Sequence, residues 1–436
     1  MKAFLDRIDY AVDHTPASRN RVVDLWRVVA LLAVVLGHWL AASVWVDPDG
    51  EIVVMNTLEW IPYAAWFTWV IQVMPIFFFV GGYSNAKALE NRSSNRRSWL
   101  TIRFRRLYAP AVPVILLWTV LTVVLREFID ADLVYAGVLN ATIPLWFLGV
   151  YLALVSIAPL THQLWERFDL WSFFMLAGAA IVVDVAYRVL DVPGIGWLNL
   201  VFVWGAVHQL GYWWADRELD RSVMSPFYSI GLAATALAAL IAVTGADWYP
   251  VAMITIPGAG PQNVTPPTSA VILLGLTQAG IILATIGPIK RFAERRSVWK
   301  GVVGISGFMM SIYVWHLTVL SLLIAVGAFT FDGAAFSLEP GTAWWWMSRP
   351  IFYVALIVVT AGFVAVFGVF ERDIDTSETD RPMIVVFVGM GLTIFALATT
   401  AFVYIVDKHA NLTWWIPATA VVAALIMRAY PSRWGR

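Results

Sequence analysis

Long apolar stretches recur along the chain, and short polar segments separate them. Most are close to about 20 residues long, which is what an α-helix needs to cross a hydrocarbon layer about 30 Å thick. The pattern therefore predicts an all-α fold, a polytopic transmembrane helical bundle of about 12 spans. The predicted spans run approximately over Val22–Val46, Ile61–Tyr83, Leu107–Leu125, Ile143–Leu160, Trp171–Tyr187, Trp197–Trp214, Pro226–Val243, Ser269–Ile286, Val302–Ala328, Trp344–Phe370, Met383–Ile405 and Leu412–Met427.

The composition agrees with a membrane protein. Apolar residues make up 60% of the 436 residues and charged residues 13%, whereas a soluble domain has about 25% charged residues. A net charge of zero gives no reason to expect a nucleic-acid partner. The lack of cysteine excludes disulfides, thiolate metal sites and a cysteine nucleophile. We expect a multi-pass protein of the inner (plasma) membrane, with the lipid bilayer as a partner and without a bound metal.

Lysine and arginine are concentrated on one side of the predicted membrane. With Met1 placed inside, 25 of the 29 basic residues fall in inner segments. The four outer ones are Arg126, Arg188, Arg349 and Lys408. Because cytoplasmic segments carry the excess of basic residues, this distribution predicts an even number of spans with both termini in the cytoplasm.

Two outer features have local interpretations. The loop from Gly245 to Thr268 is rich in proline and glycine, and long loops without structure are often functional. It is either the lid or rim of a binding site or a simple connector. Asp184 and Arg188 are spaced i, i+4 near the outer end of the fifth predicted span, so we expect them to pair with each other.

The first predicted helix carries a pair of ionisable residues, Arg27 and His38. They are separated by eleven positions, about three helical turns, and so share one face of the helix. With Arg27 at the membrane surface, His38 lies roughly 16 Å deeper, near the middle of the layer. A histidine there is costly unless it faces protein or water, which makes His38 a functional candidate. The alternative is a structural histidine that hydrogen-bonds a neighbouring helix.

The second predicted helix ends in paired glycines, Gly81 and Gly82, which either allow close approach of another backbone or let the end of the helix open. A basic segment with seven cations, Lys87 to Arg106, follows. It includes Arg103, Arg105 and Arg106. The planar guanidinium group can bind two oxygens of a phosphate at once. The segment indicates either a cytoplasmic site for a phosphorylated ligand or a topological signal that also binds anionic lipid.

Two further residues stand out in later predicted helices. His316 is a second histidine within an apolar helix, beside Tyr313 and Trp315, and the sequence favours neither a functional role nor an interhelical hydrogen bond. Glu371 closes the tenth predicted helix at its cytoplasmic end. By itself it would be an ordinary helix-end charge.

Together these motifs resemble the membrane-bound acyltransferase 3 family. The similarity extends from about residue 20 to 372 and keeps the family's order. It rests on six segments: Asp24 to His38, Phe79 to Tyr83, Arg103 to Pro110, Leu145 to Leu148, Ser311 to His316, and Phe370 to Arg372. Gly81 and Tyr83 replace the usual Ser and Phe, and Asp373 stands where proline is usual. The last two predicted helices lie outside the family's ten-helix core.

The resemblance implies three regions. Residues 1–20 would form a cytoplasmic segment, 21–372 a ten-helix acyltransferase domain, and 373–436 two additional helices with a cytoplasmic tail. The implied activity is O-acyl transfer across the membrane. The donor would be cytoplasmic acyl-CoA, commonly acetyl-CoA, acting as a co-substrate rather than a bound cofactor. The acceptor would be a hydroxyl of an extracytoplasmic carbohydrate or glycolipid of the cell envelope.

The resemblance also implies roles for individual residues. His38 would be catalytic, either as a general base or as the carrier of a covalent acyl group. The donor's phosphates would be bound by Arg27, Arg103, Arg105 and Arg106. Supporting residues would be Asp24, Tyr83, Trp146, His316 and Glu371.

A rival interpretation is a twelve-helix, proton-coupled secondary transporter with His38 as the coupling site. The helix count and the intramembrane ionisable residues support it. The lack of a repeat between the two halves argues against it, as does the lack of a Gly-Asp-Arg pattern after the second helix. The high tryptophan, alanine and valine content is typical of a GC-rich bacterium. The acceptor, the acyl chain length and the oligomeric state stay open.

Overall fold

The chain divides into two compact units built from alternating stretches of sequence. The computed structural model describes residues 2–47, 52–91, 96–218, 225–256, 260–330, 336–377 and 381–432. Unit 1 comprises Met1–Gly37, Ile61–Ser93 and Ile157–Ser306, and unit 2 comprises His38–Trp60, Ser94–Ser156 and Gly307–Arg436. Arg92 of the basic segment lies outside the described residues. The interleaved units follow from contacts between distant segments, so the local sequence pattern did not indicate them.

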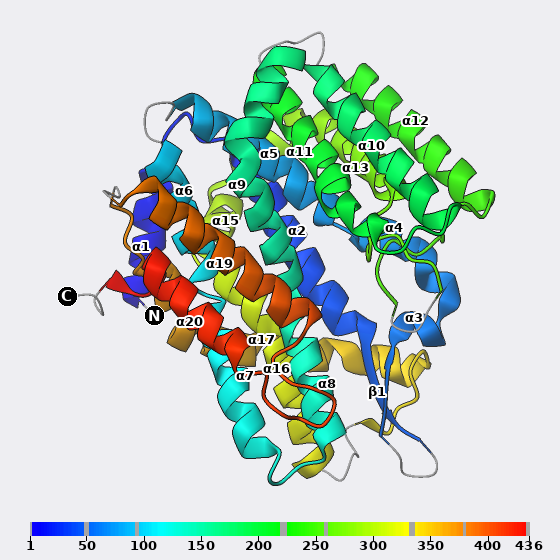
Figure 1. Ribbon diagram of the computed structural model, residues 1–436, viewed down its shortest axis with the longest axis vertical. Coiled ribbons are helices and arrows are strands. Elements are labelled where there is room, and N and C mark those ends of the chain that lie inside the picture. The colour runs from blue at the N-terminus through cyan, green and yellow to red at the C-terminus, as the bar shows by residue number, and fades with distance from the viewer. Residues whose placement is uncertain are drawn as a thin grey trace. The chain divides into compact units, whose positions relative to one another are not determined.

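Unit 1 is helical throughout its described part. Its elements are α1 (Lys2–Asp13), α2 (Arg21–Ala41) up to Gly37, η1 (Pro62–Phe67), α4 (Thr68–Ile71), α5 (Met74–Asn91), the end of α9 (Pro144–Phe168), α10 (Leu170–Arg188), η2 (Ile195–Leu198), α11 (Asn199–Arg217), α12 (Pro226–Gly245), α13 (Ser269–Ala284), α14 (Ile286–Ala293) and α15 (Arg296–Ser306). Helices α10 to α13 lie side by side, and α11 also packs against α5 (Figure 1).

Unit 2 contains the remaining helices and a short hairpin. Its elements are the last turn of α2, β1 (Ala42–Val46), β2 (Ile52–Asn56), α3 (Thr57–Trp60), α6 (Arg96–Tyr108), α7 (Val112–Leu125), α8 (Ala131–Thr142), α9 up to Ser156, α16 (Met309–Thr330), α17 (Ala343–Phe367), α18 (Val369–Arg372), α19 (Met383–Phe402) and α20 (Trp415–Met427). Helix α16 packs against α8 and α17, and α19 lies along α20 (Figure 1).

The helices account for the predicted spans without fixing their number. Within the described ranges, nine helical segments are long and apolar enough to cross a membrane, or ten if α13 and α14, bent by 64°, form one span. Each of the twelve predicted stretches contains a helix. Helices α11 and α20 do not meet the same criteria, and α20 has only 13 residues. The protein is a multi-pass membrane protein, and its twelve spans and cytoplasmic termini stay predictions.

Helix α11 carries several polar side chains for a membrane segment. They can be buried because they are paired with polar groups inside unit 1. Asn199 is fully buried and donates to Asp184 at 2.8 Å. The Nε2 atom of His208 lies 3.0 Å from the side-chain nitrogen of Asn85. Burying such groups without partners would be costly. These pairs explain how α11 packs in the interior of the unit despite its modest hydropathy.

The first predicted span extends too far at its outer end. Helix α2 ends at Ala41, and the next residues form β1, paired antiparallel with β2 from Ala42↔Asn56 onward. The hydroxyl of Thr57 donates to the carbonyl oxygen of Leu40 at 2.6 Å, so it satisfies one of the open carbonyls at the helix end. The run from Val44 to Val46 is β-branched and aromatic, which favours a strand although it is as apolar as a helix.

Helices α5 and α11 approach so closely that only glycine fits between them. A Cβ atom on Gly82 would overlap the carbonyl oxygen of His208 and lie 3.1 Å from the Cα atom of Gly211. A Cβ atom on Gly211 would overlap the carbonyl oxygen of Phe79 and lie 2.7 Å from the Cα atom of Gly82. The prediction that the paired glycines permit close packing is confirmed for Gly82.

Candidate active site

Two histidines that are distant in the sequence meet in unit 2. His38 lies in the last turn of α2, and its Nδ1 atom is 2.8 Å from the Nε2 atom of His316 on α16. The two rings are nearly parallel, with 3° between their planes and 5.1 Å between their centroids. His316 is fully buried, whereas His38 is partly exposed. The structure brings together the predicted catalytic residue and one of the predicted supporting residues.

Further hydrogen bonds hold this pair of histidines in place. The Nδ1 atom of His316 lies 2.6 Å from the carbonyl oxygen of Tyr313. The indole of Trp39 donates to the carbonyl oxygen of His316 at 3.1 Å. The hydroxyl of Tyr313 donates to the carbonyl oxygen of Pro144 at 2.9 Å, which connects α16 to the start of α9. The end of α2 is thus attached to α16 through both a ring and the backbone.

Glu371 binds the first turn of the helix that carries His316. Its carboxylate accepts from the backbone N–H groups of Met310 and Ser311, at 3.0 and 2.8 Å, and from the Ser311 hydroxyl at 2.7 Å. The first N–H groups of a helix lack partners within the helix, and a negative charge is stabilised there. Glu371 therefore supports the site through α16. No local pattern indicated its contact with Ser311, which is 60 residues away.

Trp146, another predicted supporting residue, lies in the first turn of α9 and is half-buried. Its ring contacts the ring of Phe147 edge-on, with 6.3 Å between centroids. Phe147 in turn contacts Tyr313 at 5.6 Å. Trp146 is thus connected to Tyr313 on α16 through Phe147.

A second group of predicted site residues gathers in unit 1, at the start of α2. Arg27 donates to a carboxylate oxygen of Asp24 at 3.1 Å and to the hydroxyl of Ser84. Asp24 is buried and also accepts from Arg19 at 2.6 Å. Asp24 and Ser84 therefore orient the guanidinium group of Arg27.

Tyr83 lies in a neighbouring polar cluster of the same unit. Its hydroxyl donates to Glu218 at 2.8 Å, and Asn20 donates to both Tyr83 and Glu218 at 2.9 Å. The Asn20 side chain also accepts from the backbone N–H of Val22 at 3.1 Å, at the start of α2. Sequence reasoning missed Asn20 and Glu218. Asn20 carries a recognisable signal, because asparagine is favoured just before a helix, whereas Glu218 has no local motif.

The three arginines of α6 that were predicted to bind the donor, Arg103, Arg105 and Arg106, have different surroundings, and Arg105 is the buried one. Its side chain is 2% exposed and donates to the carbonyl oxygen of Met427 at 2.8 Å. It also donates to the backbone and side-chain oxygens of Asp375, at 3.2 and 3.4 Å. Hydrogen bonds from Ser377 lower the pKa of Asp375, and Arg105 adds to this effect, so the carboxylate stays charged. In this structure Arg105 binds its own chain.

Arg103 and Arg106 are more accessible than Arg105. Arg106 is exposed, and Arg103 is half-buried with its guanidinium carbon 5.9 Å from the ring centroid of Trp99. A guanidinium group over an aromatic ring keeps its charge and its planar donors. Of the predicted donor-binding residues in unit 2, Arg106 is therefore the one that an anionic ligand reaches most directly.

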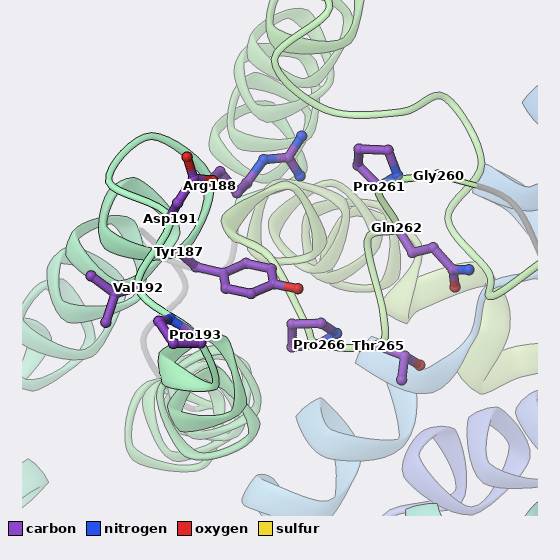
Figure 2. A pocket seen from close by; sticks show the side chains of 10 residues that line it. All are labelled: Tyr187, Arg188, Asp191, Val192, Pro193, Gly260, Pro261, Gln262, Thr265 and Pro266. Atoms are coloured by element: carbon purple, nitrogen blue, oxygen red, sulfur yellow. The ribbon is translucent and has the colours of Figure 1, made fainter.

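A cavity of about 510 Å³ lies in unit 1 between the end of α10 and the loop that follows α12 (Figure 2). It is lined by Tyr187, Arg188, Asp191, Val192, Pro193, Gly260, Pro261, Gln262, Thr265 and Pro266. The hydroxyl of Tyr187 points toward Pro266 and Thr265 (Figure 2). Asp191 has a positive φ of 50°, which is uncommon outside glycine and is often found at functional positions.

The prediction that Asp184 and Arg188 pair with each other is wrong: the structure describes both residues, and each binds other partners. Asp184 is buried and accepts from the hydroxyl of Tyr249 and the backbone N–H of Ser269, both at 2.7 Å. Arg188 donates to the carbonyl oxygen of Trp248 at 2.7 Å. Burial raises the pKa of Tyr249, and Asp184 adds to this effect, so the phenol stays a donor. Local spacing missed this because the partners come from the loop after α12 and from the first residue of α13.

Comparison with known proteins identifies the family of the chain. Residues 20–369 match the profile of the acyltransferase 3 family, which is described as an acyltransferase domain. No curated protein and no solved structure matches the chain significantly. The match covers well over half of the 436 residues and contains both His38 and His316. The chain therefore belongs to the acyltransferase 3 family and is a membrane acyltransferase.

Proposed function

We propose that the protein moves an acyl group, in the simplest case acetyl, from cytoplasmic acyl-CoA to a hydroxyl of an extracytoplasmic carbohydrate or glycolipid. The observation that carries this proposal is the contact between His38 and His316 in a chain of the acyltransferase 3 family. A partly exposed imidazole can take the proton of the acceptor hydroxyl or carry the acyl group itself. Family membership favours this activity over proton-coupled transport. We place the protein in the inner membrane of a bacterial cell.

The direct test is acyl transfer by the purified protein in lipid vesicles. Radiolabelled acetyl-CoA is supplied on one side and a fraction of envelope glycans and glycolipids on the other. We expect alkali-labile label in the glycan fraction, as for an O-ester. Comparison of acylated envelope glycans in cells with and without the gene identifies the acceptor. Proton-driven uptake of a solute without acyl transfer would instead support the transporter.

On the donor side, we assign the phosphates of acyl-CoA to Arg103 and Arg106 of unit 2. Arg106 is supported by its exposure. Arg27, which Asp24 and Ser84 orient in unit 1, stays a predicted donor-binding residue. Planar guanidinium groups suit phosphate because they bind two oxygens at once. The burial of Arg105 supports a structural role for that residue, which holds the end of α20 to α6.

The substitutions Arg106→Ala and Arg105→Ala should therefore have different effects. Arg106→Ala should weaken acyl-CoA binding by about 10- to 100-fold, for one lost charged hydrogen bond, without a change in melting temperature. Arg105→Ala should lower the melting temperature, because it removes the donor to the buried carbonyl oxygen of Met427 and to the part-buried oxygens of Asp375. Calorimetric titration with coenzyme A and thermal melting measure the two effects.

Lysine at position 106 is the matched control for charge. It should restore binding only in part, because an ammonium group cannot make the paired contact. If the alanine variants at both positions bind coenzyme A like the wild type, the basic segment acts only as a topological signal.

On the acceptor side, we assign a sugar unit of the acceptor to the cavity beside α10. Its volume, about 510 Å³, lies in the range of about 300–1,000 Å³ that is typical of ligand pockets. Proline and valine side chains form apolar walls, and Tyr187, Arg188, Asp191 and Gln262 add a ring and polar groups. A few polar groups converging on apolar walls are the usual features of a small-molecule site.

Asp191→Asn should weaken recognition of the acceptor while leaving acyl-CoA binding unchanged. Asparagine keeps the shape and tolerates the positive φ, but it loses the charge that strengthens a hydrogen bond to a sugar hydroxyl. We expect the KM for the glycan fraction to rise by about 10-fold, as for one weakened charged hydrogen bond. Initial rates at increasing acceptor concentration measure it.

Asp247→Asn is the matched control for this variant. Asp247 also has a positive φ, 58°, and is exposed in the same loop region, but it does not line the cavity. Identical acceptor dependence of the two variants would exclude the cavity as the acceptor site.

A further inference from the structure

We infer that His316 is a positioning residue that fixes which ring nitrogen of His38 carries the proton, and that the Nε2 atom of His38 is the nitrogen that reacts. The inference rests on the proposed function, because it names the reacting atom of the residue proposed to be catalytic. It starts from the two contacts of the buried His316 ring. One nitrogen lies 2.6 Å from the carbonyl oxygen of Tyr313, and the other lies 2.8 Å from His38.

The positions of the protons follow from the chemistry of these partners. A carbonyl oxygen only accepts hydrogen bonds, so the Nδ1 atom of His316 carries the proton that points at Tyr313. A neutral imidazole has one N–H, so the Nε2 atom of His316 presents a lone pair. The Nδ1 atom of His38 must then be the donor. The Nε2 atom of His38 consequently presents a lone pair, as a base or nucleophile must.

The reverse arrangement is electrostatically unfavourable. It would place the proton of His316 on Nε2 and direct the lone pair of Nδ1 at the oxygen of Tyr313, 2.6 Å away. Two lone pairs at this distance repel each other, and a buried acceptor left without a donor is costly. The carbonyl oxygen of Tyr313 therefore determines which nitrogen of His316 is protonated, and His316 in turn determines which nitrogen of His38 is protonated.

His316 can impose this order because its helix is fixed at the backbone. Glu371 holds the first turn of α16 through the N–H groups of Met310 and Ser311. Trp39 donates to the carbonyl oxygen of His316, so the residue next to His38 is tied to the same turn of α16. Glu371 and Trp39 thus act on the reaction through the position of His316.

The protons balance when the Nε2 atom of His38 acts as the base. As the acceptor oxygen bonds to the acyl carbon, its proton passes to Nε2. The C–S bond then breaks, and Nε2 returns the proton to the thiolate of coenzyme A. In between, the N–H at Nδ1 donates to His316 and stabilises the imidazolium, as a hydrogen-bonded partner does in catalytic triads.

The covalent route uses the same nitrogen. The Nε2 lone pair attacks the acyl carbon, the C–S bond breaks, and coenzyme A leaves as the thiolate. The acceptor hydroxyl then displaces Nε2 from the acyl carbon, and its proton neutralises the thiolate. Both routes convert acyl-CoA and an alcohol into an ester and free coenzyme A, so the inference holds for either.

Two substitutions of similar length separate positioning from packing. In His316→Gln the amide oxygen can still accept from the Nδ1 atom of His38, whereas His316→Met offers no comparable acceptor. We expect His316→Met to lower kcat by about 10²- to 10³-fold with less than about threefold change in the KM for acetyl-CoA, and His316→Gln to keep at least about a tenth of kcat. Equal rates for the two folded variants would overturn the inference.

The protonation of His38 can also be read without turnover. ¹⁵N NMR of histidine-labelled protein distinguishes a ring N–H from a lone-pair nitrogen, and the His38→Gln variant identifies the signals of His38. We expect Nδ1 to be protonated in the wild type and this preference to be lost in His316→Met. Protonation of His38 at Nε2 in the wild type would overturn the inference. Absence of acyl transfer by the wild type would instead reject the proposed function, and the NMR result would still decide the tautomer.

Discussion

Replacing His38 with glutamine should abolish detectable acyl transfer while the protein stays folded and binds acyl-CoA. A general base contributes about 10²- to 10⁴-fold to a rate, and glutamine can hydrogen-bond but cannot take the proton. Binding should persist because the proposed phosphate contacts belong to Arg103 and Arg106. The measurement is transfer of labelled acetyl groups by the purified variant in vesicles, with thermal melting and coenzyme A binding followed in parallel.

The matched control is His409→Gln, since His409 is exposed in the loop after α19. This variant should turn over like the wild type. A folded His38→Gln protein with a nearly unchanged rate would remove His38 from the mechanism. The contact with His316 would then be an interhelical hydrogen bond that glutamine can replace, and the proton-coupled transporter would gain support.

The substitution Gly211→Ala should strongly lower the stability of the protein, and this is the second large effect that we expect. The new methyl group would overlap the carbonyl oxygen of Phe79 and crowd the Cα atom of Gly82. Because backbone atoms of α5 cannot rotate away, the two helices must separate and lose their packing. Overpacking of this kind costs about 1–3 kcal/mol, and more when only backbone can move. Thermal melting of the purified protein in detergent measures the loss.

Gly205→Ala on the same helix is the control for this variant. A Cβ atom on Gly205 would lie 3.4 Å from a methyl group of Leu176, which is an ordinary contact. In a helix, alanine is favoured over glycine by about 1 kcal/mol, so Gly205→Ala should melt at or above the wild-type temperature. Equal melting temperatures for the two variants would contradict the close packing of α5 and α11.

The helices could be predicted from the sequence because membrane insertion is a local requirement. Each span needs a long apolar stretch of its own, and the twelve predicted stretches all contain helix. The hairpin after Ala41 was not predicted, because an apolar stretch does not distinguish a strand from the end of a helix. Val44 to Val46 form a strand through their pairing with β2, which is a contact between segments and not a property of either one.

The candidate site could be predicted only as separate residues. His38 and His316 each stood out as a histidine in an apolar helix, but their contact joins positions 278 residues apart. The sequence also provides no way to distinguish Arg105 from Arg106, since they are adjacent in the same arginine-rich segment. Burial separates them, and it depends on Met427 and Asp375 from the end of the chain.

The contacts of Arg105 bear on whether the two C-terminal helices can be removed from the protein. Its donors are satisfied by α20 and by the segment after α18, and Tyr108, one turn further along α6, donates to the carbonyl oxygen of Ala420 at 2.9 Å. A buried guanidinium group without acceptors is strongly unfavourable. A chain that ended at residue 369, where the family match ends, would leave Arg105 without its acceptors on Met427 and Asp375. The two C-terminal helices are consequently not a detachable extension, and shortening the chain to the matched residues would break the interior of unit 2.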